Sequence, residues 1–265
     1  MDKTGIASRA FDALALRSKV AIVSGAGSGI GRGIALCLAS FGASVAALDI
    51  WAEGAAETVQ RIHTNGGKAL ALTCDVTSLQ SAQNSVVKVI NAYGSIDILC
   101  NNAGAIIRKS IVETEEEEWD KSIDVTLKGA YTLSRAAIPY MVAQGGGAIV
   151  NTGSGWSMKG GAQAAAYCAA KAGVLNLTRA MAIDHGSQGI RVNCVCPGDV
   201  LTPMLMSECE QLGDKADHFL CEAARRPIAR IGTTEDIAQA VLFLVSPMSA
   251  WISGTSLVVD GGGLA

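Results

Sequence analysis

The sequence is poor in proline, in aromatic residues and in charge. Its 265 residues include 5 prolines, 5% aromatic residues and 17% charged residues, and the net charge is −3. With so little charge and 49% hydrophobic residues, the chain can bury a large core, which excludes general disorder. The small negative charge, with no basic stripe, argues against nucleic acid as a partner.

Long hydrophobic runs are also missing. No run approaches the roughly 18 apolar residues that a bilayer-spanning helix needs. The N-terminal segment MDKTGIASRAF lacks the apolar core of a secretory signal. We therefore expect a cytoplasmic protein that does not bind membranes.

The eight cysteines show no metal-binding pattern. No C-x-x-C pair occurs, and the three histidines have no ligand spacing to the cysteines. We expect no metal site, and we expect thiols that behave as small buried groups in a reducing compartment.

Apolar strand patterns alternate with helical patterns along most of the chain. This alternation predicts one α/β domain with a Rossmann-type, doubly wound parallel sheet and helices on both faces. A single helix is expected from a capping box at Thr114–Glu117 to about Met141. We divide the chain into an N-terminal extension (1–18) and a domain (19–265) in which an irregular substrate lid is expected at 199–227. Strands are expected at 20–23, 44–49, 68–74, 96–100, 148–152, 190–196 and 255–260.

A glycine-rich turn follows the first expected strand. The segment Ser24-Gly-Ala-Gly-Ser-Gly-Ile-Gly31 leads directly into a helix in which Ile34 and Leu38 repeat at helical spacing. Glycines let a backbone approach a pyrophosphate, and a helix N-terminus offers amide donors and partial positive charge. The order strand, glycine turn, helix therefore predicts a dinucleotide site.

The second expected strand ends in Asp49. An acid at this point can accept hydrogen bonds from both ribose hydroxyls and would repel a 2′-phosphate, so the sequence favours NAD over NADP. The alternative is that Asp49 caps the next helix. Two further polar residues, Asp75 and Asn102, also follow strands. In a parallel sheet these strand ends share the edge where ligands bind.

Ser154 stands just past another strand, and Tyr167-x-x-x-Lys171 follows it on an expected helix. Four-residue spacing places the phenol and the ammonium on one helix face. The positive charge is expected to lower the pKa of the Tyr167 phenol, and Gly160-Gly161 let the chain bring Ser154 near. Three such groups are suited to taking a proton from an alcohol.

Taken in this order, the motifs resemble those of the short-chain dehydrogenase/reductase family over residues 19 to 262. Gly25-x-x-x-Gly29-x-Gly31 is similar to its cofactor loop, and Pro197-Gly198 with Thr202 to its nicotinamide-side motif. The resemblance implies that the domain is a dinucleotide-binding oxidoreductase domain. It also implies a cofactor site made of Gly25, Ser28, Gly29, Ile30, Gly31, Asp49, Asp75, Val76, Asn102, Ala103, Gly104, Tyr167, Lys171, Pro197, Gly198, Val200 and Thr202.

The same resemblance implies the chemistry. Tyr167 is expected to act as general acid/base, Lys171 to lower its pKa and bind the ribose, and Ser154 to orient the substrate oxygen. We expect an NAD-dependent enzyme for a secondary alcohol or ketone, such as a polyol, a sugar or another small hydroxy compound. The alternatives are an NADPH-dependent 3-oxoacyl thioester reductase and a regulatory or scaffold protein that binds NAD. A homotetramer is implied by analogy.

Two positions depart from the family pattern. Ser24 replaces the usual Thr, which we expect to matter little. Thr126 stands where the family usually has Asn, a residue that helps to hold a water behind the lysine. Threonine is shorter and offers one hydroxyl instead of an amide. We therefore expect slower proton delivery with activity retained.

Thr126→Asn is expected to raise the turnover number, because the amide would restore the water site behind Lys171. Cofactor affinity should stay the same. Steady-state kinetics combined with an NADH titration measure both quantities. An unchanged turnover number would remove this interpretation of Thr126.

Overall fold

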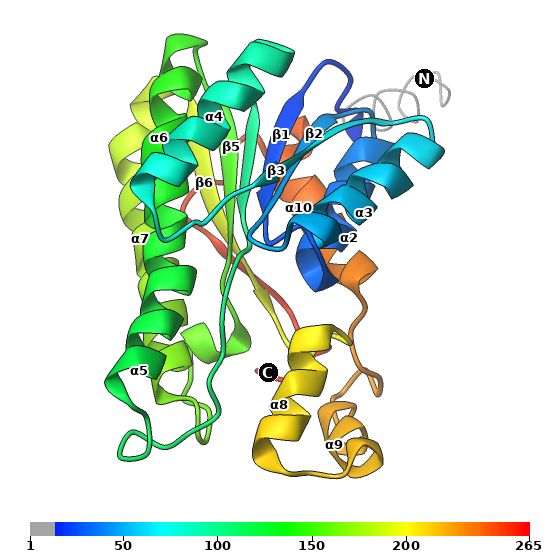
Figure 1. Cartoon of the computed structure of the whole chain (residues 1–265), viewed down its shortest axis with the longest axis vertical. Coiled ribbons are helices and arrows are strands. Elements are labelled where there is room, and N and C mark those ends of the chain that lie inside the picture. Colours follow the sequence, from blue (N-terminus) through cyan, green and yellow to red (C-terminus); the bar gives the residue numbers. More distant parts are fainter. Residues whose placement is uncertain (1–13) are drawn as a thin grey trace, which may run out of the picture.

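The computed structural model describes residues 14–265, which fold around a sheet of seven parallel strands (Figure 1). The strand order is β3-β2-β1-β4-β5-β6-β7, so it reverses direction between β1 and β4. In such sheets, ligands bind in the crevice that this reversal opens at the carboxyl ends of the strands. The predicted doubly wound sheet is confirmed. Its strands are β1 (Val20–Ser24), β2 (Ser44–Asp49), β3 (Lys68–Thr73), β4 (Ile98–Asn101), β5 (Gly147–Thr152), β6 (Ile190–Pro197) and β7 (Ser256–Val259).

Helices cover both faces of the sheet, and a separate apolar core lies under each set (Figure 1). The alternation of side chains along β1 shows the division, since Ala21 and Val23 face one core while Val20 and Ile22 face the other. One face carries α2 (Gly29–Ser40), α3 (Ala52–Thr64) and α10 (Thr234–Val245). The other carries α4 (Leu79–Tyr93), α6 (Gly129–Ala143) and α7 (Ala165–His185), with α5 (Glu116–Ile123) preceding α6.

The structure describes the chain from residue 14 onward. Residues 1–13 of the predicted extension 1–18 therefore lie outside the described residues. Leu16 belongs to the core beneath α2 and is 2% exposed. Within residues 14–265, no helix combines the length and the hydrophobicity needed to cross a membrane.

The expected single helix up to Met141 is wrong in two respects. It begins after Glu115, which forms the capping box with Glu118, so the predicted box at Thr114–Glu117 is displaced by one residue. In addition, a π-helical turn at Asp124–Lys128 separates α5 from α6. Such turns disturb the regular pairing of backbone groups and often occur at functional sites.

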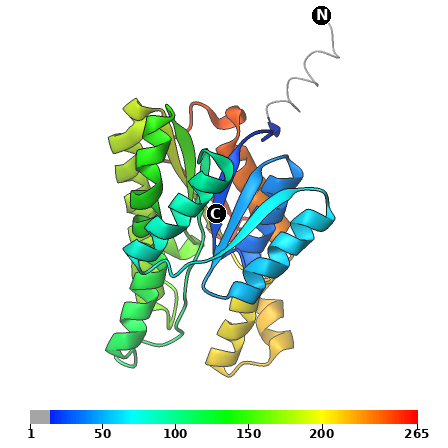
Figure 2. The ribbon, with the colours of Figure 1, turned by 45° about the horizontal axis from the view of Figure 1, so that its top comes forward.

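The segment 199–227, where a substrate lid is expected, is more regular than predicted. It contains two short helices, α8 (Pro203–Leu212) and α9 (Ala216–Ala223). Thr202 caps α8 because its hydroxyl accepts a hydrogen bond from the Leu205 amide at 3.2 Å, and Pro203 occupies the first helical turn. Both helices project beyond the ends of the strands, on the same side of the molecule as α5 (Figures 1 and 2).

Buried side-chain hydrogen bonds join the central strands to the helices behind them. Asn101 Nδ2 donates to Ser134 Oγ at 2.9 Å and to Asn151 Oδ1 at 2.8 Å. Asn151 Nδ2 donates to Thr178 Oγ1 at 2.9 Å. All four side chains are buried. Because a buried polar group is costly without its partner, this network holds α6 and α7 in place against β4 and β5.

Thr178→Val is expected to lower the free energy of unfolding by about 1–3 kcal/mol, because it leaves the Asn151 amide without its acceptor. Thr64→Val is the matched control. Both threonine hydroxyls donate to the carbonyl four residues earlier, Thr178 to Val174 and Thr64 to Gln60, but Thr64 is exposed. The control should change the free energy by less than about 0.5 kcal/mol. Urea unfolding followed by circular dichroism gives both values, and equal losses would contradict the assignment.

Candidate active site

One cavity gathers almost every predicted site residue at the carboxyl edge of the sheet. It holds about 400 Å³, which is within the usual range for small-molecule sites. Gly31 is the exception among the predicted residues, because it does not line the cavity. A Cβ atom at Gly31 would lie 2.1 Å from the Gly25 carbonyl oxygen, so its absence allows the close turn between β1 and α2.

The turn after β1 leaves the N-terminus of α2 open. Gly25 and Gly29 adopt positive φ angles of 63° and 49°, which other residues rarely adopt. Ser28 occupies the N-cap position, but its side chain makes no capping hydrogen bond. The first amides of α2 therefore have no side-chain partner at the cap, and they face a cavity lined by Ser28, Gly29 and Ile30. These features fit a bound pyrophosphate.

Asp49 lies at the end of β2 and lines the same cavity. Its Oδ2 accepts from the Gly27 amide at 2.7 Å and its Oδ1 from the Trp51 amide at 2.9 Å. Trp51 is itself the N-cap residue of α3, so the bond orients the carboxylate and does not cap the second or third helical amide. Since each carboxylate oxygen can accept more than one donor, Asp49 can still receive ribose hydroxyls.

The sequence interpretation missed Arg32, a cation near this end of the cavity. Its guanidinium donates to the Gly27 carbonyl and pairs with Glu57 at 2.9 Å, and its Nε bonds Thr58 at 3.0 Å. These partners hold Arg32 away from the lining of the cavity. Little in the sequence indicated where Arg32 would lie, because its partners Glu57 and Thr58 are on α3, far from Arg32 in the sequence.

Ser24 ties the β4 strand end to the glycine turn. Its hydroxyl accepts from the amides of Asn102 and Ala103 at 3.0 and 3.1 Å. The Asn102 side chain donates back to the Ser24 carbonyl at 3.2 Å, and Thr152 Oγ1 donates to Asn102 Oδ1 at 3.3 Å. One hydroxyl is enough for these contacts. The expectation that serine replaces threonine here at little cost stays a prediction.

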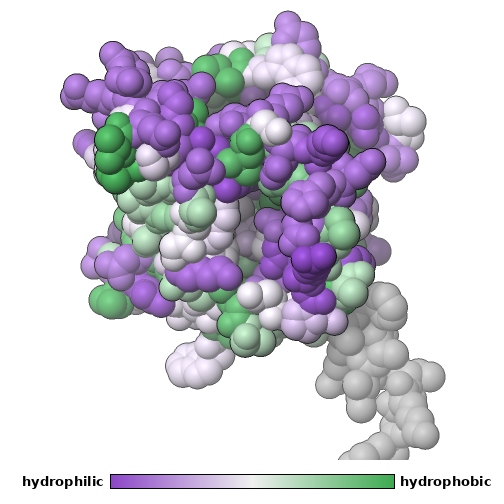
Figure 3. Space-filling view, turned by 90° about the horizontal axis from the view of Figure 1, so that it is seen from below, coloured by the Kyte–Doolittle hydropathy of each residue, from purple (hydrophilic) through white to green (hydrophobic). Residues whose placement is uncertain are grey.

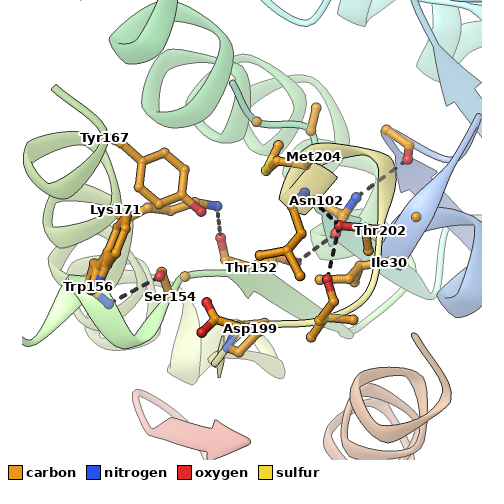
Figure 4. Close-up of a pocket in the computed structure, with 18 of the residues that line it drawn as sticks. Ile30, Asn102, Thr152, Ser154, Trp156, Tyr167, Lys171, Asp199, Thr202 and Met204 are labelled. Carbon is orange, nitrogen blue, oxygen red and sulfur yellow. Dashed lines mark hydrogen bonds between the residues drawn. The ribbon is translucent and has the colours of Figure 1, made fainter. Parts of the chain in front are cut away.

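Ser154, Tyr167 and Lys171 lie together on one side of the cavity (Figure 4). Ser154 begins a short 3₁₀ turn after β5, and its hydroxyl accepts from the Trp156 amide at 3.1 Å. Tyr167 and Lys171 come from the first turns of α7. Lys171 Nζ donates to the Thr152 carbonyl at 2.6 Å and lies 5.5 Å from the centre of the Tyr167 ring. The expected convergence of the three side chains is therefore present.

The expected lowering of the Tyr167 pKa is not found. Burial raises the pKa of this phenol above its usual value of 10, the negative charge of Glu208 adds to the rise, and the Ser154 hydroxyl opposes it. Burial also lowers the pKa of Lys171 to about 8, so its positive charge is itself weakened near neutral pH. The sequence identified the two groups but did not show that they are buried, and burial is the largest cause of both pKa shifts.

Thr126 lies in the π-helical turn and is buried. Its Oγ1 accepts from the Ala105 amide at 3.2 Å, which fixes the loop after β4. A Cβ atom at Gly104 would lie 3.6 Å from both Lys171 Nζ and Thr126 Oγ1, so the two side chains border the same small space. The expected position of Thr126 close to the lysine agrees with this geometry.

The end of the cavity next to Ser154 and Tyr167 is built by residues that no motif marked. Trp156 meets Tyr167 edge to face, with ring centres 6.0 Å apart. Met204 and Glu208 approach from α8, and Asp199 lies beside Gly198 in an ion pair with Arg226. The mixed polarity of residues 199–227 was the available signal for the lid, but it did not indicate which side chains would face inward.

Comparisons with known proteins agree with this geometry. A family model described as enoyl-(acyl carrier protein) reductase matches residues 25–263. A 3-oxoacyl-(acyl-carrier-protein) reductase of Thermotoga maritima is 38% identical over 247 residues, covering 93% of this chain and 98% of the relative. A short-chain dehydrogenase/reductase of Aspergillus oryzae is 38% identical over 251 residues, with coverages of 93% and 95%.

Solved structures show the same likeness over the whole fold. A protein of Beutenbergia cavernae, assigned as an NAD(P)-dependent gluconate 5-dehydrogenase and containing NADP at low occupancy, has a TM-score of 0.88 and 36% identity. The match covers 95% of this chain and 98% of the other. A 7α-hydroxysteroid dehydrogenase in complex with NADH and 7-oxo glycochenodeoxycholic acid also gives 0.88 and 36%, with coverages of 95% and 96%.

Lys171→Met is expected to raise the free energy of unfolding at pH 7 by about 1–3 kcal/mol, because it removes a desolvated cation. The unfolded chain protonates this lysine up to pH 10.5, whereas the folded protein does so only up to about pH 8. Lys171 therefore lowers the free energy of unfolding of the wild-type protein below pH 8, and this effect disappears as the pH rises to 10.5. The advantage of the variant should shrink over the same window.

Urea unfolding at pH 7 and at pH 10 measures this difference. The matched control is Lys128→Met, which removes a half-exposed lysine paired with Asp124 and should change stability by less than about 0.5 kcal/mol. A Lys171→Met protein less stable than wild type at pH 7 would show that the Thr152 hydrogen bond outweighs the desolvation.

Proposed function

The chain belongs to the short-chain dehydrogenase/reductase family, and we propose that it oxidises the secondary alcohol of a polyol, sugar or other small hydroxy compound with NAD. As a member of this family it is an oxidoreductase that acts on hydroxy or keto groups. The observation that carries the proposal is the single cavity that joins Asp49 and the open end of α2 to Ser154, Tyr167 and Lys171.

The proposed roles follow from the positions of the side chains. The Tyr167 phenolate takes the proton of the alcohol during oxidation, and the phenol so formed gives it back during ketone reduction, while Ser154 orients the substrate oxygen. Lys171, fixed by the Thr152 carbonyl, holds the nicotinamide ribose and contributes its charge beside the phenol. When bound, the nicotinamide supplies the hydride chemistry and, in its oxidised form, a positive charge. The glycine turn and Asp49 position it.

The choice of NAD is supported by Asp49, since its carboxylate would repel a 2′-phosphate. Arg32 is the nearby cation that could attract that phosphate, but Glu57, Thr58 and the Gly27 carbonyl already engage it. The solved relatives contain NADP in one case and NADH in the other, so they support a nicotinamide cofactor without selecting one.

Reduction of 3-oxoacyl thioesters with NADPH is the second candidate, favoured by the Thermotoga maritima relative of that name. Asp49 argues against it. The NAD-binding scaffold is opposed by the convergence of Ser154, Tyr167 and Lys171 in one cavity. The homotetramer and the cytoplasmic location stay predictions.

The test is a screen of NAD⁺ and NADP⁺ reduction over polyols, sugars, hydroxy acids and cyclic alcohols. We expect activity with NAD⁺, and a loss of about 10³-fold in turnover for Tyr167→Phe, because the proton acceptor is removed. NADH affinity of this variant, followed by fluorescence, should fall far less than its turnover, because Tyr167 is one of many residues expected to hold the cofactor. Tyr140→Phe, which alters a tyrosine on the outer side of α6, should keep full activity.

Each alternative gives a different result in this screen. Equal or better activity with NADP⁺ would overturn the interpretation of Asp49. Turnover confined to a 3-oxoacyl thioester with NADPH would favour the reductase, and NADH binding without turnover on any substrate would favour the scaffold.

A further inference from the structure

An ion pair beneath the lid connects the catalytic side of the cavity to α8. Arg108, in the loop after β4, donates from Nη1 to Glu208 Oε2 at 2.6 Å. Only 10% of the Arg108 side chain and 13% of the Glu208 side chain are exposed. A charge pair so far removed from water needs well-defined geometry to be tolerated, so its placement is a specific feature of this site.

Further contacts fix Arg108 from several directions. Its Nη2 donates to the Ala162 carbonyl at 3.2 Å, and its backbone amide donates to Gln211 Oε1 at 2.9 Å. The guanidinium also lies 5.0 Å from the centre of the Trp156 ring. Arg108 is therefore immobilised, and it determines where the Glu208 carboxylate is held.

The negative member of the ion pair lies at the cavity. Glu208 lines the cavity, whereas Arg108 lies behind it and does not. The second carboxylate oxygen of Glu208, Oε1, forms no hydrogen bond within residues 14–265. It is not fully buried, so a ligand atom can reach it. A carboxylate only accepts hydrogen bonds, so Oε1 is suited to a hydroxyl donor of the ligand.

The other charged groups at this end of the cavity are engaged, buried or peripheral. Asp260 Oδ1 accepts from the Gly262 amide at 2.9 Å, and Asp260 Oδ2 is a buried atom without a partner among the described residues. Asp199 is paired with Arg226, and Lys171 is bonded to the Thr152 carbonyl. Lys159 is exposed at the rim. The surrounding face beyond the strand ends is largely hydrophilic (Figure 3). Glu208 is thus a charged acceptor directed at the substrate, close enough to Tyr167 for its charge to act on the phenol.

We propose that Glu208 determines specificity by accepting a hydrogen bond from a second hydroxyl of the substrate, so that neutral diols and polyols are preferred over hydroxy acids. The inference rests on the proposed function, because it presumes alcohol oxidation at Tyr167. A neutral donor suits the site because Arg108 already balances the charge of Glu208. A substrate carboxylate at the same place would meet the like charge of Glu208 and could not hydrogen-bond to it, because both groups only accept hydrogen bonds.

The test compares four probes that share one ring and one kind of reacting carbon: cyclohexanol, cyclohexane-1,2-diol, cyclohexane-1,4-diol and 4-hydroxycyclohexanecarboxylate. With wild-type protein, kcat/KM for at least one diol should exceed that for cyclohexanol by about tenfold, since a hydrogen bond to a charged group contributes that much discrimination. The hydroxy acid should fall below cyclohexanol. The assay uses whichever of NAD⁺ and NADP⁺ the cofactor screen shows to be active, so its result does not depend on the interpretation of Asp49.

Glu208→Gln removes the charge and keeps the shape. Because the charge of Glu208 also acts on Tyr167, the comparison uses ratios to cyclohexanol measured with the same variant. We expect the kcat/KM ratio of diol to cyclohexanol to fall several-fold and that of hydroxy acid to cyclohexanol to rise by about tenfold. Glu210→Gln makes the same change two residues further along α8, at an exposed position, and should leave the ranking unchanged. An NADH titration confirms that both variants are folded.

The outcomes separate this inference from the function on which it rests. If wild-type protein binds NADH but oxidises none of the four probes, the proposed alcohol oxidation fails and this inference fails with it. If cyclohexanol is oxidised as well as the diols, or the acid better than the diols, only the role of Glu208 is overturned. An unchanged ranking in Glu208→Gln also overturns it. If that variant does not fold, the wild-type ranking decides.

Discussion

A buried lysine sets the geometry around which the site is arranged. The hydrogen bond of 2.6 Å from Lys171 to the Thr152 carbonyl joins α7 to the end of β5. Holding a cation there is unfavourable, and the pKa of Lys171 falls to about 8 as a result. Stability must therefore come from elsewhere, chiefly the two apolar cores and the buried Asn101–Asn151–Thr178 network that keeps α7 against the sheet.

The two ends of the cavity follow different rules. The cofactor end depends on backbone geometry: an open helix N-terminus, glycines with positive φ, and Asp49 held by two amides. The proposed substrate end depends on side chains from separate segments, with Arg108 from the loop after β4, Trp156 from the turn after β5 and Glu208 from α8. A common core can therefore keep one cofactor geometry while the lid changes the substrate.

Sequence reasoning succeeded where local chemistry and strand order were sufficient. Alternating strands and helices gave the sheet, and residues at strand ends such as Asp49, Asp75 and Asn102 do line one cavity. It failed where the outcome depended on packing. The π turn around Thr126 leaves no mark in an otherwise helical pattern, and the helices α8 and α9 occupy a stretch that looked irregular. Burial also reversed the expected direction of the Tyr167 pKa shift.

The sequence by itself determined the fold class, the glycine turn and the spacing of Tyr167 and Lys171, because each of these depends on residues near one another in the chain. The tertiary structure alone decided the electrostatics. Desolvation depends on everything packed around a group, so it could not be read from Tyr167 or Lys171 alone. The Arg108–Glu208 pair was equally invisible, since its members are separated by 100 residues and meet only when α8 folds over the strand ends.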